Sequence, residues 1–341
     1  MPALLHVSDD LRPVSDALTR ALARVERRVI EGLESDLPPV RTLCRHVERY
    51  HGKMVRPVLA LASGMAWRAA DGAEDREPDP AEDCVTVAAV CELVHLATLV
   101  HDDVLDEADT RRRGATINWL KGNEAAVVLG DFLFSSAYRM CSRLGDQATA
   151  EIIAGVGRTL CAGELLQLHH RGDFSLDEAT YFEIIRRKTA SLISAACRLG
   201  ARHAGAPDAV AARLGEFGSR LGIAFQIQDD LLDLTGDQSV VGKSLGKDLQ
   251  NGKLTLPLIH HLAVAEPSQR GRTLLLLERA CDGAEAPALA ADLDRTGSLA
   301  HARDSARRLV LEAKECLAVV PESPARRFLA SLADAVVERE F

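Results

Sequence analysis

The stretch His101-Asp102-Asp103-Val104-Leu105-Asp106 follows a long apolar run and places three aspartates within five positions. On an α-helix with about 3.6 residues per turn, Asp102 and Asp106 lie one above the other on the same face. Like charges at this spacing repel one another unless a cation lies between them. Aligned carboxylate oxygens are the ligands that a hard divalent cation such as Mg²⁺ accepts. The stretch therefore predicts a helix end that binds a metal ion.

The same pattern occurs again as Asp229-Asp230-Leu231-Leu232-Asp233, also after an apolar helical run. A single acidic cluster is explained most simply as a solvated helix face. Two copies of D-D-x-x-D, each at the end of a nearly uncharged helix, favour a metal site instead. Gln226 precedes Asp229 by three residues and Asp230 by four, so it shares the face of the second cluster.

The composition indicates a helical protein and argues against several other classes. Of the 341 residues, 47% are hydrophobic but only 4% are aromatic, which favours helices over a β-sandwich or barrel. The formal net charge of −9 argues against a nucleic-acid binder, which needs a basic surface. The eight cysteines form no C-x-x-C pair, which predicts free thiols in a reducing cytoplasm. No signal peptide is visible, and the longest apolar run, residues 84–100, contains Glu92 and His95 and therefore predicts a buried helix.

Apolar periodicity predicts helices along most of the chain. They are expected over residues 14–33, 40–57, 84–100, 150–169 and 214–233, with another beginning near residue 124. The segment Ser175-Leu176-Asp177-Glu178 is typical of a capping box that opens the following helix. Residues 71–83 are polar and proline-rich, which predicts a solvent loop. Residues 235–253 contain repeated Gly-Lys pairs and are expected to form a lid over the active site.

Basic residues accompany the first acidic cluster. Lys53 and Arg56 lie three residues apart on one helix face, which indicates an anion site or a surface basic pair. His95 lies two turns before Asp102 on nearly the same face, where it is a ligand contact or a core histidine. The run 111–113 is Arg-Arg-Arg, and guanidinium groups bind phosphate in bidentate fashion. Acidic metal ligands followed by arginines predict a site for a metal-bound polyphosphate.

Taken together, these motifs resemble those of the trans-isoprenyl diphosphate synthases, and within them the long-chain polyprenyl synthases. The resemblance extends from Gly52 to at least Pro257. It is carried by G-K-x-x-R-P at 52–57, the first D-D-x-x-D with its arginines, Gly130-Asp131, Lys188-Thr189, Phe225-Gln226 through Asp233, and Gly242-Lys243 through Pro257.

The resemblance implies an all-α isoprenoid synthase fold: a single domain over residues 1–341, with roughly a dozen helices around a deep central cavity, in a homodimer. It implies a cytoplasmic prenyltransferase of isoprenoid biosynthesis that adds isopentenyl diphosphate head to tail to an allylic primer. The primer would be dimethylallyl, geranyl, farnesyl or geranylgeranyl diphosphate, and the product long, about C30 to C50. The expected cofactor is Mg²⁺, as three ions, with Mn²⁺ as a substitute.

Carried over residue by residue, the resemblance assigns roles to the candidate site residues. The metal site is expected to comprise Asp102, Asp103, Asp106, Asp229, Asp230 and Asp233. The substrate-binding residues are expected to be Lys53, Arg56, His95 and Arg112 for isopentenyl diphosphate, and Arg111, Lys243 and Lys253 for the allylic diphosphate. The catalytic group is expected to be Lys188, Thr189 and Gln226. Small residues before the first aspartate, namely Val94, Ala97 and Thr98, imply that no bulky side chain stops chain growth.

Three other functions stay open. A short-chain farnesyl or geranylgeranyl diphosphate synthase would share the motifs and release a product of about C15 to C20. A class I terpene cyclase would not need a second diphosphate site, and its usual N/D-S/T-E metal motif is absent. A partner subunit of a heteromeric prenyl synthase could lose its aspartates, yet both motifs are intact. No transmembrane segment is expected, and peripheral membrane contact during product release is left open.

Overall fold

The computed structural model describes residues 9–50, 52–68, 79–111, 114–235, 247–279 and 286–338. These residues are almost entirely helical, and the strands among them form a short antiparallel ribbon of β1 (Thr110–Arg111) and β2 (Gly114–Ala115). The all-α class predicted from composition and periodicity is therefore confirmed. Two predicted substrate-binding residues, Arg112 and Lys243, lie outside the described residues.

The chain divides into two compact units. Unit 1 comprises residues 1–157, 192–218 and 316–330, and unit 2 comprises residues 158–191, 219–315 and 331–341. The expectation of one domain around a deep central cavity stays a prediction.

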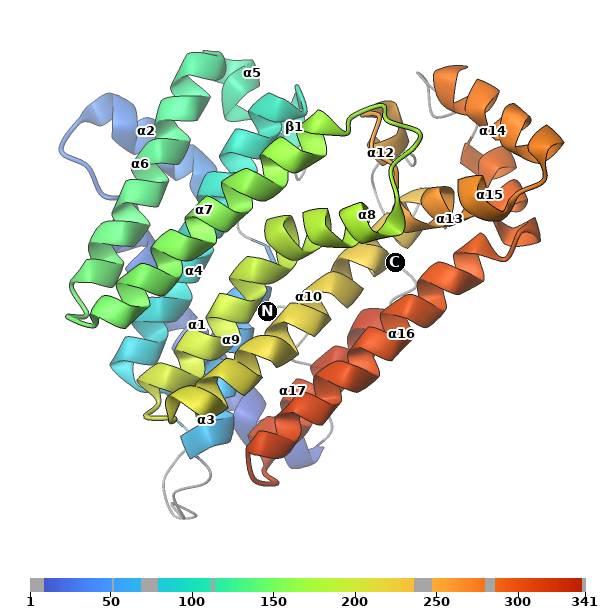
Figure 1. Ribbon diagram of the computed structural model, residues 1–341. Coiled ribbons are helices and arrows are strands. Elements are labelled where there is room, and N and C mark those ends of the chain that lie inside the picture. The colour runs from blue at the N-terminus through green and yellow to red at the C-terminus, as the bar shows by residue number, and fades with distance from the viewer. Residues whose placement is uncertain are drawn as a thin grey trace. The chain divides into compact units, whose positions relative to one another are not determined.

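Unit 1 is built around α4 (Glu82–Leu105), which packs against α1 (Arg12–Leu33), α3 (Val55–Arg68) and α6 (Asn123–Ser142) (Figure 1). Its other elements are η2 (Asp9–Leu11), α2 (Pro38–Val47), η3 (Glu48–Tyr50), α5 (Ile117–Lys121), η6 (Leu317–Val319), most of α9 (Ser191–His203), and the first parts of α7 (Gln147–His169), α10 (Asp208–Thr235) and α17 (Pro324–Val337). The predicted amphipathic helix over 14–33 corresponds to α1, whose apolar stripe is buried.

α4 is apolar on all sides because it lies in the core of unit 1. Within the described part of the chain, it is the helix long and apolar enough to cross a membrane, and 78% of its apolar window is buried inside the protein. This agrees with the prediction of a buried helix. The helix begins at Glu82, so it includes the last residues of the predicted solvent loop 71–83, whose residues 71–78 lie outside the described part.

Unit 2 contains the second half of α10 and the helices that follow it. Its other elements are the second part of α7, α8 (Glu178–Ile185), the π-helical segment η5 (Arg186–Ala190), α12 (Lys247–Gln250), α13 (Leu256–Val264), α14 (Pro267–Arg279), α15 (Ala286–Arg295), most of α16 (Ser298–Cys316) and the end of α17. Part of the predicted lid, residues 236–246, lies outside the described residues. The rest is not all loop, because α12 forms a helical turn there.

The predicted capping box before α8 was shifted by two residues. The cap is Asp177, whose side chain accepts a hydrogen bond from the Thr180 backbone N–H at 2.8 Å. The Ser175 hydroxyl instead donates to Asp173 at 2.5 Å. Both residue types are good helix caps, but the hydroxyl and the backbone N–H of Ser175 both donate to Asp173, which leaves Asp177 to cap the helix.

Two glycines allow α3 and α9 to touch through their backbones. A Cβ atom on Gly200 of α9 would lie 1.9 Å from the carbonyl oxygen of Ala60, and one on Gly64 of α3 would lie 2.8 Å from that of Gly200. Neither position can accept a side chain unless the helices separate. Backbone atoms cannot give way as a flexible side chain does.

We expect Gly200→Ala to destabilise the protein by about 1–3 kcal/mol, because the added methyl group over-packs a backbone contact. Gly155→Ala is the matched control, since Gly155 lies on an exposed part of α7 where a Cβ atom meets nothing within 4 Å. The control should be neutral or gain up to about 1 kcal/mol, because alanine favours a helix. Chemical denaturation of both variants measures this, and equal effects would refute the close-approach argument.

Candidate active site

Both aspartate motifs lie in the last turns of their helices. α4 ends at Leu105, after which Glu107 adopts a φ of 48° and the Ala108 N–H donates to the Asp103 carbonyl at 2.9 Å. α10 ends at Thr235, two residues after the second motif. A helix C-terminus carries partial negative charge, so carboxylates there are destabilising unless a cation binds beside them. This placement strengthens the case for a metal site.

Each motif contains two kinds of aspartate. In the first motif Asp102 and Asp106 are partly exposed, whereas Asp103 is only 1% exposed. In the second motif Asp230 is 4% exposed, whereas its two neighbours in the motif, Asp229 and Asp233, are partly exposed. The first and last aspartates of each motif are therefore accessible to an ion, whereas the middle aspartate is buried in the protein interior.

Asp103 is held by an arginine that was predicted to bind substrate. Arg111 on β1 places Nε and Nη2 each 2.8 Å from Asp103 Oδ1. Burial raises the pKa of Asp103, and the adjacent guanidinium acts in the opposite direction. Burial also raises the pKa of Tyr50 to about 12, with the Asp103 charge adding to the effect. The ion pair between Arg111 and Asp103 therefore holds β1 against the end of α4.

The Gly130-Asp131 motif positions the residue before the first aspartate. A Cβ atom on Gly130 would lie 2.1 Å from His101 Nε2, so only glycine leaves room for that ring. The same nitrogen lies 3.1 Å from the Val127 carbonyl oxygen and 3.6 Å from Asp131 Oδ1. The Gly130-Asp131 motif therefore lets the His101 ring pack against α6.

Three of the residues predicted to bind isopentenyl diphosphate lie within the described residues, namely Lys53, Arg56 and His95. Lys53 is exposed just before α3, and Arg56 is partly exposed in its first turn, so the prediction that the two share a helix face is wrong. Burial raises the pKa of Cys91 on α4 to about 12, and the charge of Arg56 acts in the opposite direction. Met54, between the two cations, is 5% exposed and has a φ of 53°, a strained conformation often found at functional sites.

Lys188 is fixed by two polar residues of α7. Its Nζ lies 2.7 Å from Glu164 Oε1 and 2.9 Å from Gln167 Oε1. It lies in the π-helical segment η5, and such segments often occur at functional sites. Gly163 permits the contact, because a Cβ atom there would lie 2.8 Å from Arg187 Cβ. The sequence placed Glu164 and Gln167 on one helix but gave no sign of this pairing.

The other two predicted catalytic residues belong to one hydrogen-bonded chain. The Thr189 hydroxyl donates to Gln226 Oε1 at 2.7 Å, and Gln226 Nε2 donates to Asp230 Oδ1 at 2.8 Å. Tyr181 of α8 donates to Asp230 Oδ2 at 2.7 Å. Burial, followed by the charge of Asp248, raises the pKa of Asp230; burial and the Asp230 charge raise the pKa of Tyr181. Sequence analysis had assigned Tyr181 no role.

Lys253 is tied to the second motif through the backbone. The Asp248 N–H donates to Asp233 Oδ2 at 3.1 Å, and the Lys253 N–H donates to the Asp248 carbonyl at 2.8 Å. Gly252, with a φ of 66°, provides the turn between them. The end of the predicted lid is therefore attached beside Asp233.

The three predicted chain-length residues differ in burial. Val94 and Ala97 are 0% exposed and lie in the core of unit 1. Thr98 is partly exposed, as are His95 and Asp102, and the three share one face of α4. Burial therefore favours Thr98 as the residue of this set that can reach a ligand bound beside Asp102.

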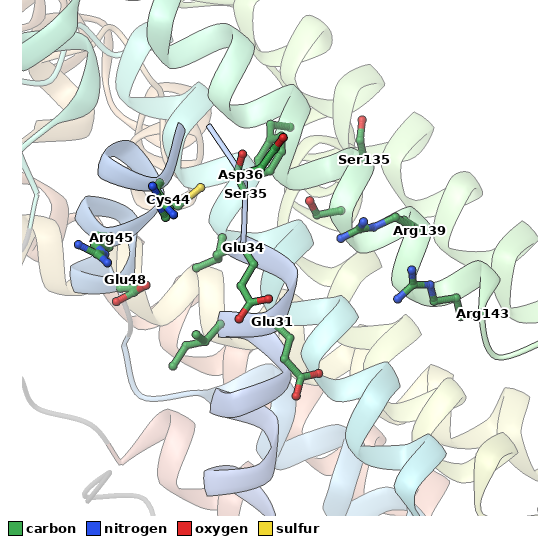
Figure 2. A pocket seen from close by; sticks show the side chains of 15 residues that line it. Glu31, Glu34, Ser35, Asp36, Cys44, Arg45, Glu48, Ser135, Arg139 and Arg143 are labelled. Atoms are coloured by element: carbon green, nitrogen blue, oxygen red, sulfur yellow. The ribbon is translucent and has the colours of Figure 1, made fainter. Parts of the chain in front are cut away.

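No group of three or more His, Cys, Asp or Glu side chains that could hold a metal ion occurs among the residues described. A cavity of about 1130 Å³ lies elsewhere in unit 1, between α1, α2 and α6. Figure 2 shows Arg139 of α6 and Arg143 just after it on one side of the cavity, and Glu31 of α1 and Glu34 just after it on another. None of the predicted site residues lines this cavity, and its lining carries charges of both signs.

The helical fold and its two D-D-x-x-D helix ends, with basic residues near both, define an isoprenoid synthase. The chain matches the polyprenyl synthetase family over residues 38–291 and belongs to that family. It is 34% identical over 340 residues to an octaprenyl diphosphate synthase of Escherichia coli (strain K12), covering 97% of this chain and 99% of the relative.

Solved structures agree with this assignment. A decaprenyl diphosphate synthase from Rhodobacter capsulatus superposes with a TM-score of 0.87 at 33% identity, covering 97% of this chain and 99% of that one. A polyprenyl synthase from Caulobacter crescentus CB15, complexed with calcium and isoprenyl diphosphate, gives a TM-score of 0.84 at 33% identity, covering 96% and 98%. The predicted isoprenoid synthase fold is confirmed.

The difference between buried and exposed aspartates makes a testable prediction. We expect Asp103→Asn to lower the free energy of unfolding by about 1.5–3 kcal/mol, because it weakens a charged hydrogen bond in the interior. Asp102→Asn should leave stability unchanged or raise it, since it removes a negative charge from a helix C-terminus. Urea denaturation compares the two variants. A larger loss for Asp102→Asn would contradict this assignment.

Proposed function

We propose that the protein is a long-chain all-trans-polyprenyl diphosphate synthase that adds isopentenyl diphosphate head to tail to an allylic diphosphate primer. The observation that carries the proposal is the pair of helix ends, each with two partly exposed aspartates around a buried one. The likeness to octaprenyl and decaprenyl diphosphate synthases supports a long product.

We assign metal binding to Asp102 and Asp106 of unit 1 and to Asp229 and Asp233 of unit 2, with Mg²⁺ as the ion, three ions in all, and Mn²⁺ as a substitute. The donor set fits, because Mg²⁺ is usually held by one or two carboxylates together with substrate phosphates. Bound there, Mg²⁺ would neutralise charge on the departing diphosphate and favour cleavage of the allylic C–O bond.

The chain's own side chains bind and orient the two substrates. In this proposal Arg111, Lys188, Lys243 and Lys253 bind the allylic diphosphate, and Lys53, Arg56, His95 and Arg112 bind isopentenyl diphosphate. The oxygen dipoles of Thr189 and Gln226 stabilise positive charge that develops on the allylic carbon. No protein nucleophile is needed, because the double bond of isopentenyl diphosphate attacks that carbon.

We further propose a cytoplasmic homodimer. Support for the dimer comes from exposed apolar side chains on two helices of unit 1 that contact each other, α5 and α6: Trp119 is 64% exposed, Leu120 46% and Val128 67%. Large apolar side chains exposed on adjacent helices are typical of a protein interface. A second copy of the chain is the partner that such a surface fits.

The direct test is incubation with labelled isopentenyl diphosphate, each primer in turn, and Mg²⁺, followed by measurement of product length. We expect elongation to a long polyprenyl diphosphate. Asp102→Ala or Asp229→Ala should lower kcat by at least about 10²-fold, the scale of losing a main electrostatic stabiliser. Release of a cyclised hydrocarbon would indicate a terpene cyclase, and activity only with an added protein would indicate a heteromeric subunit.

Thr98 and Ala97 of α4 differ in burial, so phenylalanine at these two positions should have different effects. Thr98→Phe should shift the product toward a short chain while preserving the fold, because its side chain starts from a partly exposed position. Ala97→Phe should instead destabilise the protein by about 1–3 kcal/mol, because a ring over-packs the core. Product length and thermal unfolding of both variants check this. A stable Ala97→Phe variant with a short product, beside an unaffected Thr98→Phe, would reverse the assignment.

A further inference from the structure

Four side chains of unit 2 form one continuous chain of hydrogen bonds, and it ends at the proposed catalytic threonine. Tyr181 donates to Asp230 Oδ2 at 2.7 Å, and Gln226 Nε2 donates to Asp230 Oδ1 at 2.8 Å. Thr189 Oγ1 then donates to Gln226 Oε1 at 2.7 Å. The residues come from α8, η5 and α10, so the chain joins three separate segments.

Because these side chains are buried, each hydrogen bond in the chain has a defined donor and a defined acceptor. Tyr181 is 3% exposed, Asp230 4% and Thr189 9%. An unpaired polar atom in such surroundings costs about 1–3 kcal/mol, so each donor must face an acceptor. Both side-chain oxygens of Asp230 accept hydrogen bonds, Oδ1 from the Gln226 N–H and Oδ2 from the Tyr181 O–H. Asp230 therefore faces an N–H on the side of Gln226 and an O–H on the side of Tyr181.

We propose that Asp230 is a positioning residue, held by its hydrogen bond with Tyr181. It decides which group donates and which accepts in each hydrogen bond from Gln226 to Thr189. It holds the Gln226 amide with its N–H toward Asp230 and its carbonyl toward Thr189. Thr189 must then donate to that carbonyl, and the lone pairs of its Oγ1 stay available to positive charge. This inference rests on the proposed function, in which positive charge develops on the allylic carbon.

Asp230→Asn tests the direction without changing the size of the side chain. An asparagine that keeps accepting from Tyr181 presents its Nδ2 to Gln226. The Gln226 amide must then turn, and its N–H points at Thr189 and occupies the lone pairs. We expect kcat of the first condensation to fall by about 100-fold, the scale of losing an oriented dipole. The Mg²⁺ requirement and both KM values should stay unchanged.

A second substitution should restore the direction. In the double variant Asp230→Asn/Tyr181→Phe the tyrosine hydroxyl is gone, so the carbonyl of the new asparagine is no longer held away from Gln226. The original arrangement of Gln226 and Thr189 becomes accessible again, at the cost of an unpaired amide N–H beside the phenyl ring at position 181, and the double variant should recover part of the kcat that Asp230→Asn loses. Tyr138→Phe is the matched control, because Tyr138 is 48% exposed on α6. Combined with Asp230→Asn, it should give no recovery.

Two results of the activity measurements would overturn the proposal. One is a double variant no more active than Asp230→Asn, since a purely structural role predicts additive losses. The other is an Asp230→Asn variant whose kcat returns at high Mg²⁺, as expected of a metal ligand. A wild-type protein without prenyl transfer would refute the proposed function itself. That result is distinct from an active wild type in which rescue fails.

Circular dichroism and thermal unfolding establish that each variant is folded. If Asp230→Asn does not fold, hydrogen exchange in the wild-type protein tests the proposal instead. The side-chain N–H of ¹⁵N-labelled Gln226 that donates to Asp230, assigned by its loss in Gln226→Met, should exchange slowly with deuterated solvent, because Asp230 Oδ1 accepts its hydrogen bond. Rapid exchange of this proton would overturn the proposal.

Discussion

Negative charge at the C-terminal ends of two helices is the constraint on which the candidate site depends. Each motif places three carboxylates where the helix dipole is already negative, an arrangement that is costly without a cation. In both motifs the middle aspartate is withdrawn into the protein and hydrogen-bonded there. The two outer carboxylates are then separated by one helical turn and are open to an ion.

The two motifs bury the middle aspartate in chemically different ways. Asp103 is balanced by the full charge of Arg111, which ties the end of α4 to β1. Asp230 is satisfied by the neutral donors Tyr181 and Gln226, which tie α10 to α8. A neutral pairing leaves the carboxylate charge uncompensated, and burial accordingly raises the pKa of Asp230 well above its usual value. The first motif thus stabilises its unit, whereas the second organises the polar groups beside it.

Glycines bring the site residues into position in both units. Gly130 leaves room for the His101 ring next to the first motif, and Gly163 lets α7 approach the segment that carries Lys188. In each case a Cβ atom would collide with a neighbouring side chain or backbone. The π-helical turn at η5 adds to this, since it brings Lys188 and Thr189 toward different partners, Glu164 and Gln226.

The sequence by itself determined the all-α fold, the long buried helix and the two acidic helix ends, because these follow from spacings of three, four and seven residues along one helix. Tertiary structure alone decided which aspartates are buried, since Asp230 meets Tyr181 across 49 residues of sequence and Lys188 meets Glu164 across 24. It also decided that Ala97 lies in the core while Thr98 does not. Local periodicity shows which residues share a face, but the packing of other helices settles what that face meets.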